Sequence, residues 1–164
     1  MRDIDSDAGI RLLSASAVPL LLTGTTAETA LAEIQIPGGA LGPHGIVRLT
    51  SSWSWTANAN NKTLRTRLGG LAGTILRSTV QTTNLMIFEI VMFGNQGAAN
   101  SQKVFQPLST VTPFNVSSAA QPTAAIDTSL TQSLVISGQL ANAGDSVTLE
   151  AYLLELIGVK PANQ

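Results

Sequence analysis

Apolar and polar residues alternate along most of this 164-residue chain. In the segments 29–36 and 46–56, residues of one parity are mainly apolar and those of the other are polar, which is the period of a β-strand with one buried face. The segment 84–93 is apolar at both parities, as is typical of a strand covered on both sides. Glycine-, asparagine- and proline-rich stretches separate such segments. The pattern therefore predicts strands and no amphipathic helix.

This pattern predicts an all-β fold, an antiparallel β-sandwich of jelly-roll type with about eight or nine strands. Residues 1–16 show no clean period, so we expect an N-terminal arm there. A single sandwich domain is expected at 17–160, with an irregular excursion at 109–128 and a short C-terminal tail at 161–164. The expected strands are 17–23, 29–36, 46–56, 62–68, 74–81, 84–93, 101–108, 132–140 and 145–157.

Both tryptophans lie two positions apart in the segment 46–56. Trp53 and Trp55 share a parity with Leu49, whereas the neighbouring Arg48 has the opposite parity. Rings that stack on a sugar or a base would be expected beside the cations. Parity therefore favours positions in the core or in a subunit contact. The residues expected to be buried are Leu49, Trp53, Trp55, Leu64, Leu68, Ile87, Val91, Leu134, Ile136, Leu149 and Leu153.

Charge is scarce in this chain. Charged residues make up 12% of it, about half the ~25% of an ordinary soluble domain, while 44% of the residues are hydrophobic. Serine, threonine, asparagine and glutamine take the polar positions, and burying a hydroxyl or an amide costs far less than burying a charge. This composition indicates large polar interfaces and hence assembly. The net charge of -1 gives no general reason to bind nucleic acid.

The cations are unevenly distributed. Between Ile34 and Phe88 the chain contains no carboxylate. The same stretch contains Arg48, Lys62, Arg65, Arg67 and Arg77. We therefore expect this part of the fold to carry a positive face.

The chain offers little catalytic chemistry. Cysteine is absent, which excludes disulfides, thiolate catalysis and cysteine-ligated metal centres. The single histidine, His44, lies in a glycine- and proline-rich loop, and one imidazole cannot hold a zinc ion. No serine stands in a G-x-S-x-G context. The longest apolar run, Leu85–Phe93, is far too short to span a membrane. We expect no enzyme activity, no metal and no cofactor.

Four segments carry a resemblance to a known group of proteins. They are TGTTAET (23–29), IPGGALGPHG (36–45), NNKTLRTRLGG (60–70) and DSVTLEAYLLEL (145–156). Together with the tryptophan strand, they resemble small structural proteins of tailed bacteriophages over residues 20–157. The resemblance implies a jelly-roll-type sandwich and a virion component that is typically trimeric. It implies either a decoration (cement) protein on the capsid or a domain of a tail fibre or spike.

The organisation of the chain favours the decoration protein. It reaches the predicted sandwich within about 20 residues and shows no heptads or repeats of a fibre shaft. We expect a protein made in the host cytoplasm and located on the capsid surface of the virion. Its expected partners are two further copies of itself and the major capsid protein, without nucleic acid or membrane. The alternative is a tail knob that binds a host-surface glycan through loops 37–45 and 94–100.

Two sets of residues are candidates for contacts. For docking on the capsid, we expect an apolar cluster of the arm that orders on binding, together with outward-facing arginines. These candidates are Ile10, Leu12, Leu13, Arg48, Arg65 and Arg67. For the trimer interface, we expect apolar residues that one sandwich cannot bury on its own. These candidates are Met86, Phe88, Met92 and Tyr152.

Overall fold

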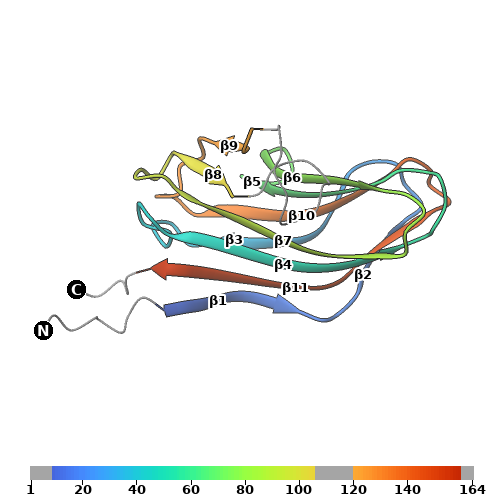
Figure 1. The fold of residues 1–164 in the computed structure, drawn as a ribbon, viewed down its shortest axis with the longest axis horizontal. Helices are drawn as coiled ribbons and strands as arrows, with labels where there is room; N and C mark the ends of the chain where they lie inside the picture. Colours follow the sequence, from blue (N-terminus) through green and yellow to red (C-terminus); the bar gives the residue numbers. More distant parts are fainter. Residues whose placement is uncertain (1–8, 106–119, 160–164) are drawn as a thin grey trace, which may run out of the picture.

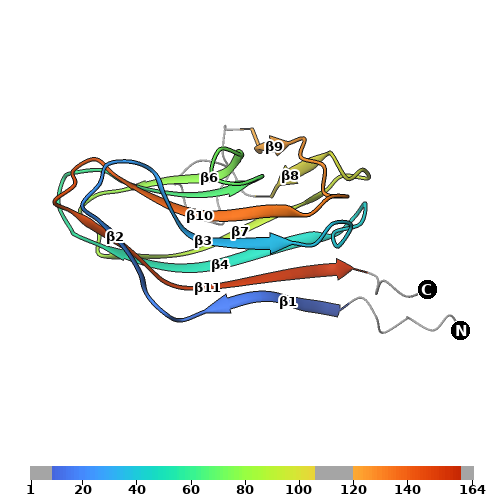
Figure 2. The same cartoon turned by 180° about the vertical axis from the view of Figure 1, so that it is seen from behind.

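The computed structural model describes residues 9–105 and 120–159, and the only regular secondary structure in these ranges is β-strand. Two antiparallel sheets pack face to face (Figures 1 and 2). The larger contains, in spatial order, β1 (Gly9–Ser16), β11 (Ser146–Val159), β4 (Ile46–Trp55), β7 (Met86–Asn95), β8 (Gln102–Val104) and β9 (Thr123–Ala124), and β2 (Leu20–Thr23) also pairs with β11. The smaller contains β3 (Thr29–Ile36), β10 (Gln132–Leu140), β5 (Lys62–Leu68) and β6 (Thr74–Gln81).

The strand pairing is nested. β5 pairs with β6, β4 with β7, β3 with β10 and β2 with β11, as in one long hairpin. This hairpin is folded over so that successive strand pairs lie in alternate sheets. Further pairing of β10 with β5 and of β11 with β4 joins its two halves. This arrangement is a jelly roll, which confirms the predicted fold class.

The N-terminal segment differs from the prediction. Residues 9–16 are not a separate arm but strand β1, which pairs along its length with β11. A register shift between Leu12 and Ser14 breaks the alternation that would have revealed this strand in the sequence. Residues 1–8, 106–119 and 160–164 lie outside the described residues, and they include the C-terminal tail and the whole first half of the expected excursion. Among the described residues, no helix is long and apolar enough to cross a membrane.

The core lies between the two sheets and contains both tryptophans. Trp53 and Trp55 are only 2% and 6% exposed. The indole Nε1 of Trp53 donates to Oγ of Ser51 at 3.0 Å, and that of Trp55 donates to the carbonyl oxygen of Thr82 at 3.2 Å. Both rings are therefore satisfied parts of the core, as the parity argument predicts.

All but two of the residues predicted to be buried lie fully in this core. Ile87 is half-buried and packs against it. Leu153 faces the outside of the sandwich, so its predicted burial is wrong. A β-bulge between Leu149 and Ala151 shifts the parity of β11, and Leu154 is the buried residue instead.

Candidate interaction surface

The outer face of the larger sheet, which points away from the core, presents apolar side chains in rows. On β7, the outward residues Met86 and Phe88 are 63% and 64% exposed. Ile90 and Met92 follow at the same parity. We call these four residues the β7 strip. Isolated exposed apolar residues are common on protein surfaces, but a continuous row along one strand is typical of a contact surface.

A second row lies on the same face along β1 and β11, at the β1 margin of the sheet. Ile10 and Leu12 of β1 are 59% and 57% exposed and pair with Ile157 and Glu155 of β11. Leu153, two positions before Glu155, also faces outward. We call Ile10, Leu12, Leu153 and Ile157 the β1 strip. Strand β4 lies between the two strips and presents Arg48, Thr50, Ser52 and Ser54.

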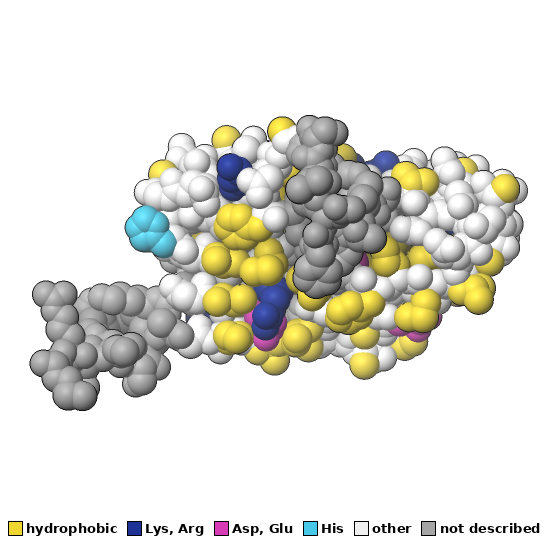
Figure 3. Space-filling model, viewed as in Figure 1, with side chains coloured by type: hydrophobic (Ala, Val, Ile, Leu, Met, Phe, Trp, Pro, Cys, Tyr) yellow, Lys and Arg dark blue, Asp and Glu magenta, His cyan; other side chains and the backbone are white. Residues whose placement is uncertain are grey.

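One ion pair stands within this face. Arg48 donates from Nε and Nη2 to Oε2 of Glu155, each at 2.8 Å, and this carboxylate raises the pKa of Arg48. Figure 3 shows hydrophobic side chains gathered on this side of the molecule around a cation and an anion that lie side by side, with further charged side chains nearer the margins. The two charges neutralise each other, and the face also carries Glu150, whose carboxylate accepts a hydrogen bond from Oγ of Ser54. The face is therefore mainly apolar, with few and scattered charges.

A shallow depression of about 360 Å³ lies between the two strips. Its walls include Phe88 of the β7 strip and Leu153 of the β1 strip. Ala15, Ser52 and Ala151 also line it, and their small side chains leave room for a protruding side chain of a partner. The outer face is therefore apolar and also contains a depression into which a partner's side chain could fit.

The structure separates the four trimer-interface candidates. Met86, Phe88 and Met92 lie together on the β7 strip. Tyr152 pairs with Ser51 and packs against the core, and its hydroxyl lies 3.3 Å from Oγ of Ser14. The bulge that turns Leu153 outward turns Tyr152 inward, so Tyr152 does not belong to this strip.

The capsid-docking candidates are also separated. Ile10 and Leu12 are exposed on β1, whereas Leu13 is half-buried and packs against the core. Arg48 lies on the outer face of the larger sheet. Arg65 and Arg67 lie on β5 of the smaller sheet. The three arginines therefore do not form one docking face.

The predicted positive face is wrong, because every cation of the stretch 35–87 forms an ion pair with a carboxylate from outside it. The pairs join Arg48 to Glu155, Lys62 to Asp145, Arg65 and Arg67 to Glu28, and Arg77 to Glu89. These carboxylates come from strands and loops distant in sequence, so the local charge pattern could not reveal them.

Glu28 is the centre of the largest of these networks. Arg67 donates to both of its oxygens at 2.8 Å, Arg65 donates at 3.0 Å, and Oγ of Ser137 donates at 2.6 Å. The Arg67 hydrogen bonds, with those of Ser137 and the nearby cations, lower the pKa of Glu28 from 4.5 to about 2 despite partial burial. This carboxylate therefore fastens the end of the β2–β3 loop to β5 and β10.

Glu28→Gln is expected to remove most of the acid dependence of stability that this network causes. A carboxylate whose pKa is lowered in the folded state stabilises the protein above its unfolded pKa, and that stability is lost as the pH falls through about 2. The variant should be less stable than the parent at pH 7 by roughly 2–3 kcal/mol. Between pH 4.5 and pH 2 the difference should shrink. Urea unfolding across this range measures it, with Glu33→Gln on the exposed side of β3 as control.

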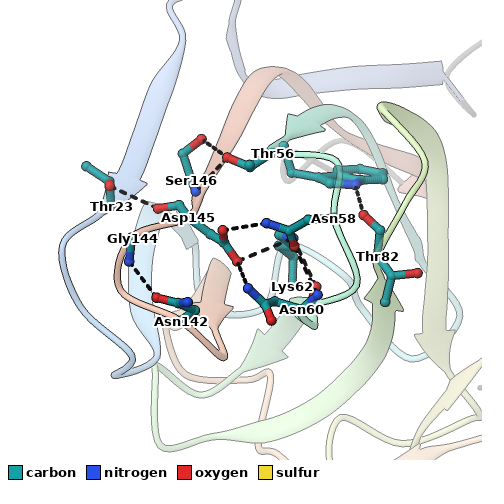
Figure 4. Close-up of polar contacts among 11 residues, drawn as sticks. Thr23, Thr56, Asn58, Asn60, Lys62, Thr82, Asn142, Gly144, Asp145 and Ser146 are labelled. Carbon is teal, nitrogen blue, oxygen red and sulfur yellow. Dashed lines mark hydrogen bonds and ion pairs between the residues drawn. The ribbon is translucent and has the colours of Figure 1, made fainter.

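Lys62 was not identified from the sequence as a structural residue. It is 0% exposed, and its Nζ donates to Oδ1 of Asn58 and to the carbonyl oxygen of Asn60 at 2.9 Å (Figure 4). Nζ also lies 3.4 Å from Oδ2 of Asp145. Lys62 has the same parity in β5 as the inward-facing Leu64, and this shared parity is the feature of the sequence that indicates its burial.

Asp145 completes this buried cluster. Its carboxylate accepts hydrogen bonds from Nδ2 of Asn58 at 2.7 Å and from Nδ2 of Asn60 at 3.0 Å, and these bonds lower its pKa. Lys62 lowers it further. The cluster ties the β4–β5 loop to the β10–β11 loop. Its polar groups satisfy one another, so its arrangement is that of a structural clasp.

The two loops expected to bind a glycan under the alternative lie at one end of the sandwich and contact each other. The amide of Gly97 donates to the carbonyl oxygen of Pro43 at 2.9 Å, and Nδ2 of Asn95 donates to that of Gly42 at 2.6 Å. His44 is exposed in the first loop. Across the described ranges, no group of three or more histidine or acidic side chains could hold a metal ion.

The fold and the surface together define a jelly-roll β-sandwich with an apolar outer face. No protein-family model matches the sequence, and no curated protein is significantly similar to it. Among solved structures, the chain is similar to the CBM2 module of the evolved Dit of Lactobacillus casei BL23 phage J-1, with 11% identity, a TM-score of 0.38, and coverage of 79% of this chain and 70% of that chain.

Two further similar structures come from other sources. The sacbrood virus of honeybee gives 10% identity, a TM-score of 0.34, and coverage of 98% of this chain and 77% of that chain. Lectin I from Ulex europaeus, in complex with the methyl glycoside of alpha-L-fucose, gives 11% identity, a TM-score of 0.33, and coverage of 93% and 94%. At such TM-scores these similarities carry no inference about function.

Proposed function

We propose that this protein is a virion structural protein of a tailed bacteriophage, and that it decorates the capsid as a homotrimer bound to the major capsid protein. The observation that carries the proposal is the uncovered apolar outer face of the larger sheet. Two of its residues, Met86 and Phe88, are more than half exposed. The sequence resemblance supplies the class of protein, and the low charge fits a chain that is largely covered in an assembly.

The proposed mechanism is thermodynamic, and the protein acts without catalysis. A trimer that bridges a junction between capsid subunits stabilises the assembled, expanded shell if it binds that state better than the precursor. A ligand at 100 times its Kd stabilises the state it binds by about 2.7 kcal/mol per site. Three linked contacts raise the effective affinity further, because the second and third form within one complex.

Phe88→Lys is expected to convert the trimer to monomer. A charge placed in the centre of the β7 strip would be buried without a partner in the interface, which costs several kcal/mol. Sedimentation equilibrium should give about three times the 17.0 kDa chain mass for the parent protein and one chain mass for the variant. Leu130→Lys is the control, because Leu130 is 62% exposed in the loop before β10 and should keep the trimer. A parent protein that is a stable monomer at micromolar concentration contradicts the trimer.

Binding to isolated shells tests the decoration role. Purified protein is mixed with expanded heads or with precursor shells that lack it, and bound protein is measured after sedimentation of the shells. The proposal predicts saturable binding to expanded heads and at least tenfold weaker binding to precursor shells. Deletion of residues 1–8, which leaves β1 intact, tests whether the N-terminal end takes part in docking. Equal binding to both shells, or none, contradicts the decoration role.

A further inference from the structure

The proposed trimer requires two different contact patches on each subunit. A ring with three-fold symmetry has a heterologous interface, in which one patch of a subunit meets another patch of the next. The outer face of the larger sheet offers two such patches, the β1 strip and the β7 strip. They run along opposite sides of strand β4, and Figure 1 shows β1 and β7 separated by β11 and β4.

The two strips are similar in direction and complementary in chemistry. At about 3.3 Å per residue, the β1 strip extends for roughly 13 Å from Leu153 to Ile157, and the β7 strip for roughly 20 Å from Met86 to Met92. The β1 strip consists of leucine and isoleucine, and the β7 strip adds the longer Met86, Phe88 and Met92. Branched aliphatic side chains on one subunit and long flexible or aromatic ones on the other can interdigitate.

The exposed edge of strand β1 is a second reason to expect a partner at the β1 strip. It is an edge strand, and residues 9–12 are exposed on both of its faces. Exposed edge strands usually carry lysine, proline or a covering segment that prevents association. Among residues 9–16 the only charged side chain is Arg11, and proline is absent. An edge with so little protection fits a strand that is covered in the assembled protein.

The charge of the face favours a second copy as the occupant. Arg48 and Glu155 neutralise each other, and the face also carries Glu150, which accepts a hydrogen bond from Oγ of Ser54, and Lys103 of β8, which pairs with Gly94. These charges are of both signs and scattered, so they form neither a basic nor an acidic patch for a charged partner. The chain as a whole has a net charge of -1, so copies repel one another weakly.

We propose that the β1 strip of each subunit packs against the β7 strip of the next subunit around a three-fold axis. This rests on the proposed trimer and adds to it the two surfaces that meet. It assigns Ile10 and Leu12 to the contact between subunits and not to the capsid.

Cysteine crosslinking tests this directly, because the chain contains no cysteine. Leu12→Cys and Phe88→Cys are made singly and together and are oxidised, with a short bifunctional maleimide as a second reagent of longer reach. Both positions are more than half exposed, so the variants should fold. The double variant is expected to give covalent dimers and trimers in at least tenfold greater yield than either single variant. Mixing the two single variants should give linked dimers only.

A control pair of cysteines and the possible negative results distinguish a wrong pairing of the strips from the absence of a trimer. Leu12→Cys combined with Leu71→Cys, in the turn after β5, should not link subunits beyond the level of the single variants. Efficient linkage of either single variant would mean that a patch meets itself, which overturns the heterologous contact. A trimer by sedimentation without linkage of the double variant by either reagent overturns the pairing of these strips while leaving the trimer. A monomer by sedimentation overturns both.

Discussion

Lys62→Met is expected to lower the free energy of unfolding by about 3–5 kcal/mol. The methionine fills nearly the same volume, so the loss arises from the charge and its hydrogen bonds, not from a cavity. Removal of Nζ takes away the side-chain donor to the carbonyl oxygen of Asn60 and one of the two donors to Oδ1 of Asn58, and it leaves the Asp145 carboxylate without its cation. The β4–β5 and β10–β11 loops should separate as a consequence.

Lys62→Met is made in the Phe88→Lys variant, which is expected to be a monomer. Urea unfolding of the two proteins then measures the effect of Lys62 without a contribution from subunit dissociation. Lys103→Met is the matched control, because Lys103 lies half-buried on the short strand β8, and its removal should change stability by less than about 1 kcal/mol. A loss at Lys62 no larger than that of the control would mean that water replaces the ammonium without cost. The clasp would then not be a structural element of the fold.

Trp53→Ala is expected to cost about 3–5 kcal/mol in the same background. Trp53 is among the largest fully buried side chains, and its removal leaves a cavity between the sheets and Ser51 without its donor. Leu130→Ala, at an exposed apolar position, should have little effect. Urea unfolding measures both, and the remaining fluorescence of Trp55 reports on the core of the variant. A loss below about 1 kcal/mol for Trp53→Ala would contradict its place as a core residue.

The parity of single strands could be predicted from the sequence. Trp53, Leu64 and Val91 are buried as expected, because β4, β5 and β7 run without a bulge through these positions. The same argument places Met86 and Phe88 outside. It does so correctly because β7 is central in its sheet and apolar on both faces, one of which the sandwich cannot cover.

Bulges and distant charge pairs could not be predicted in this way. The bulge before Ala151 exchanges the faces of Tyr152 and Leu153, and the irregularity near Leu13 hides β1. One extra residue inverts the parity of everything that follows it, and no local signal marks the position. The sequence alone did not indicate ion-pair partners for the cations of β5. Glu28 and Asp145 are distant from them in the sequence and approach them only in the folded protein.

We propose that this protein belongs to the virion head, and imaging of virions tests this location most directly. Cryo-electron microscopy is performed on virions of the phage that encodes the chain, and on virions that carry Phe88→Lys in its place. We expect trimeric density on the outer surface of the head that fits three jelly-roll sandwiches, and its loss or strong reduction in the variant. Density for the protein only at the tail would support the glycan-binding knob instead. Virions that lack the protein altogether would contradict a role in the virion.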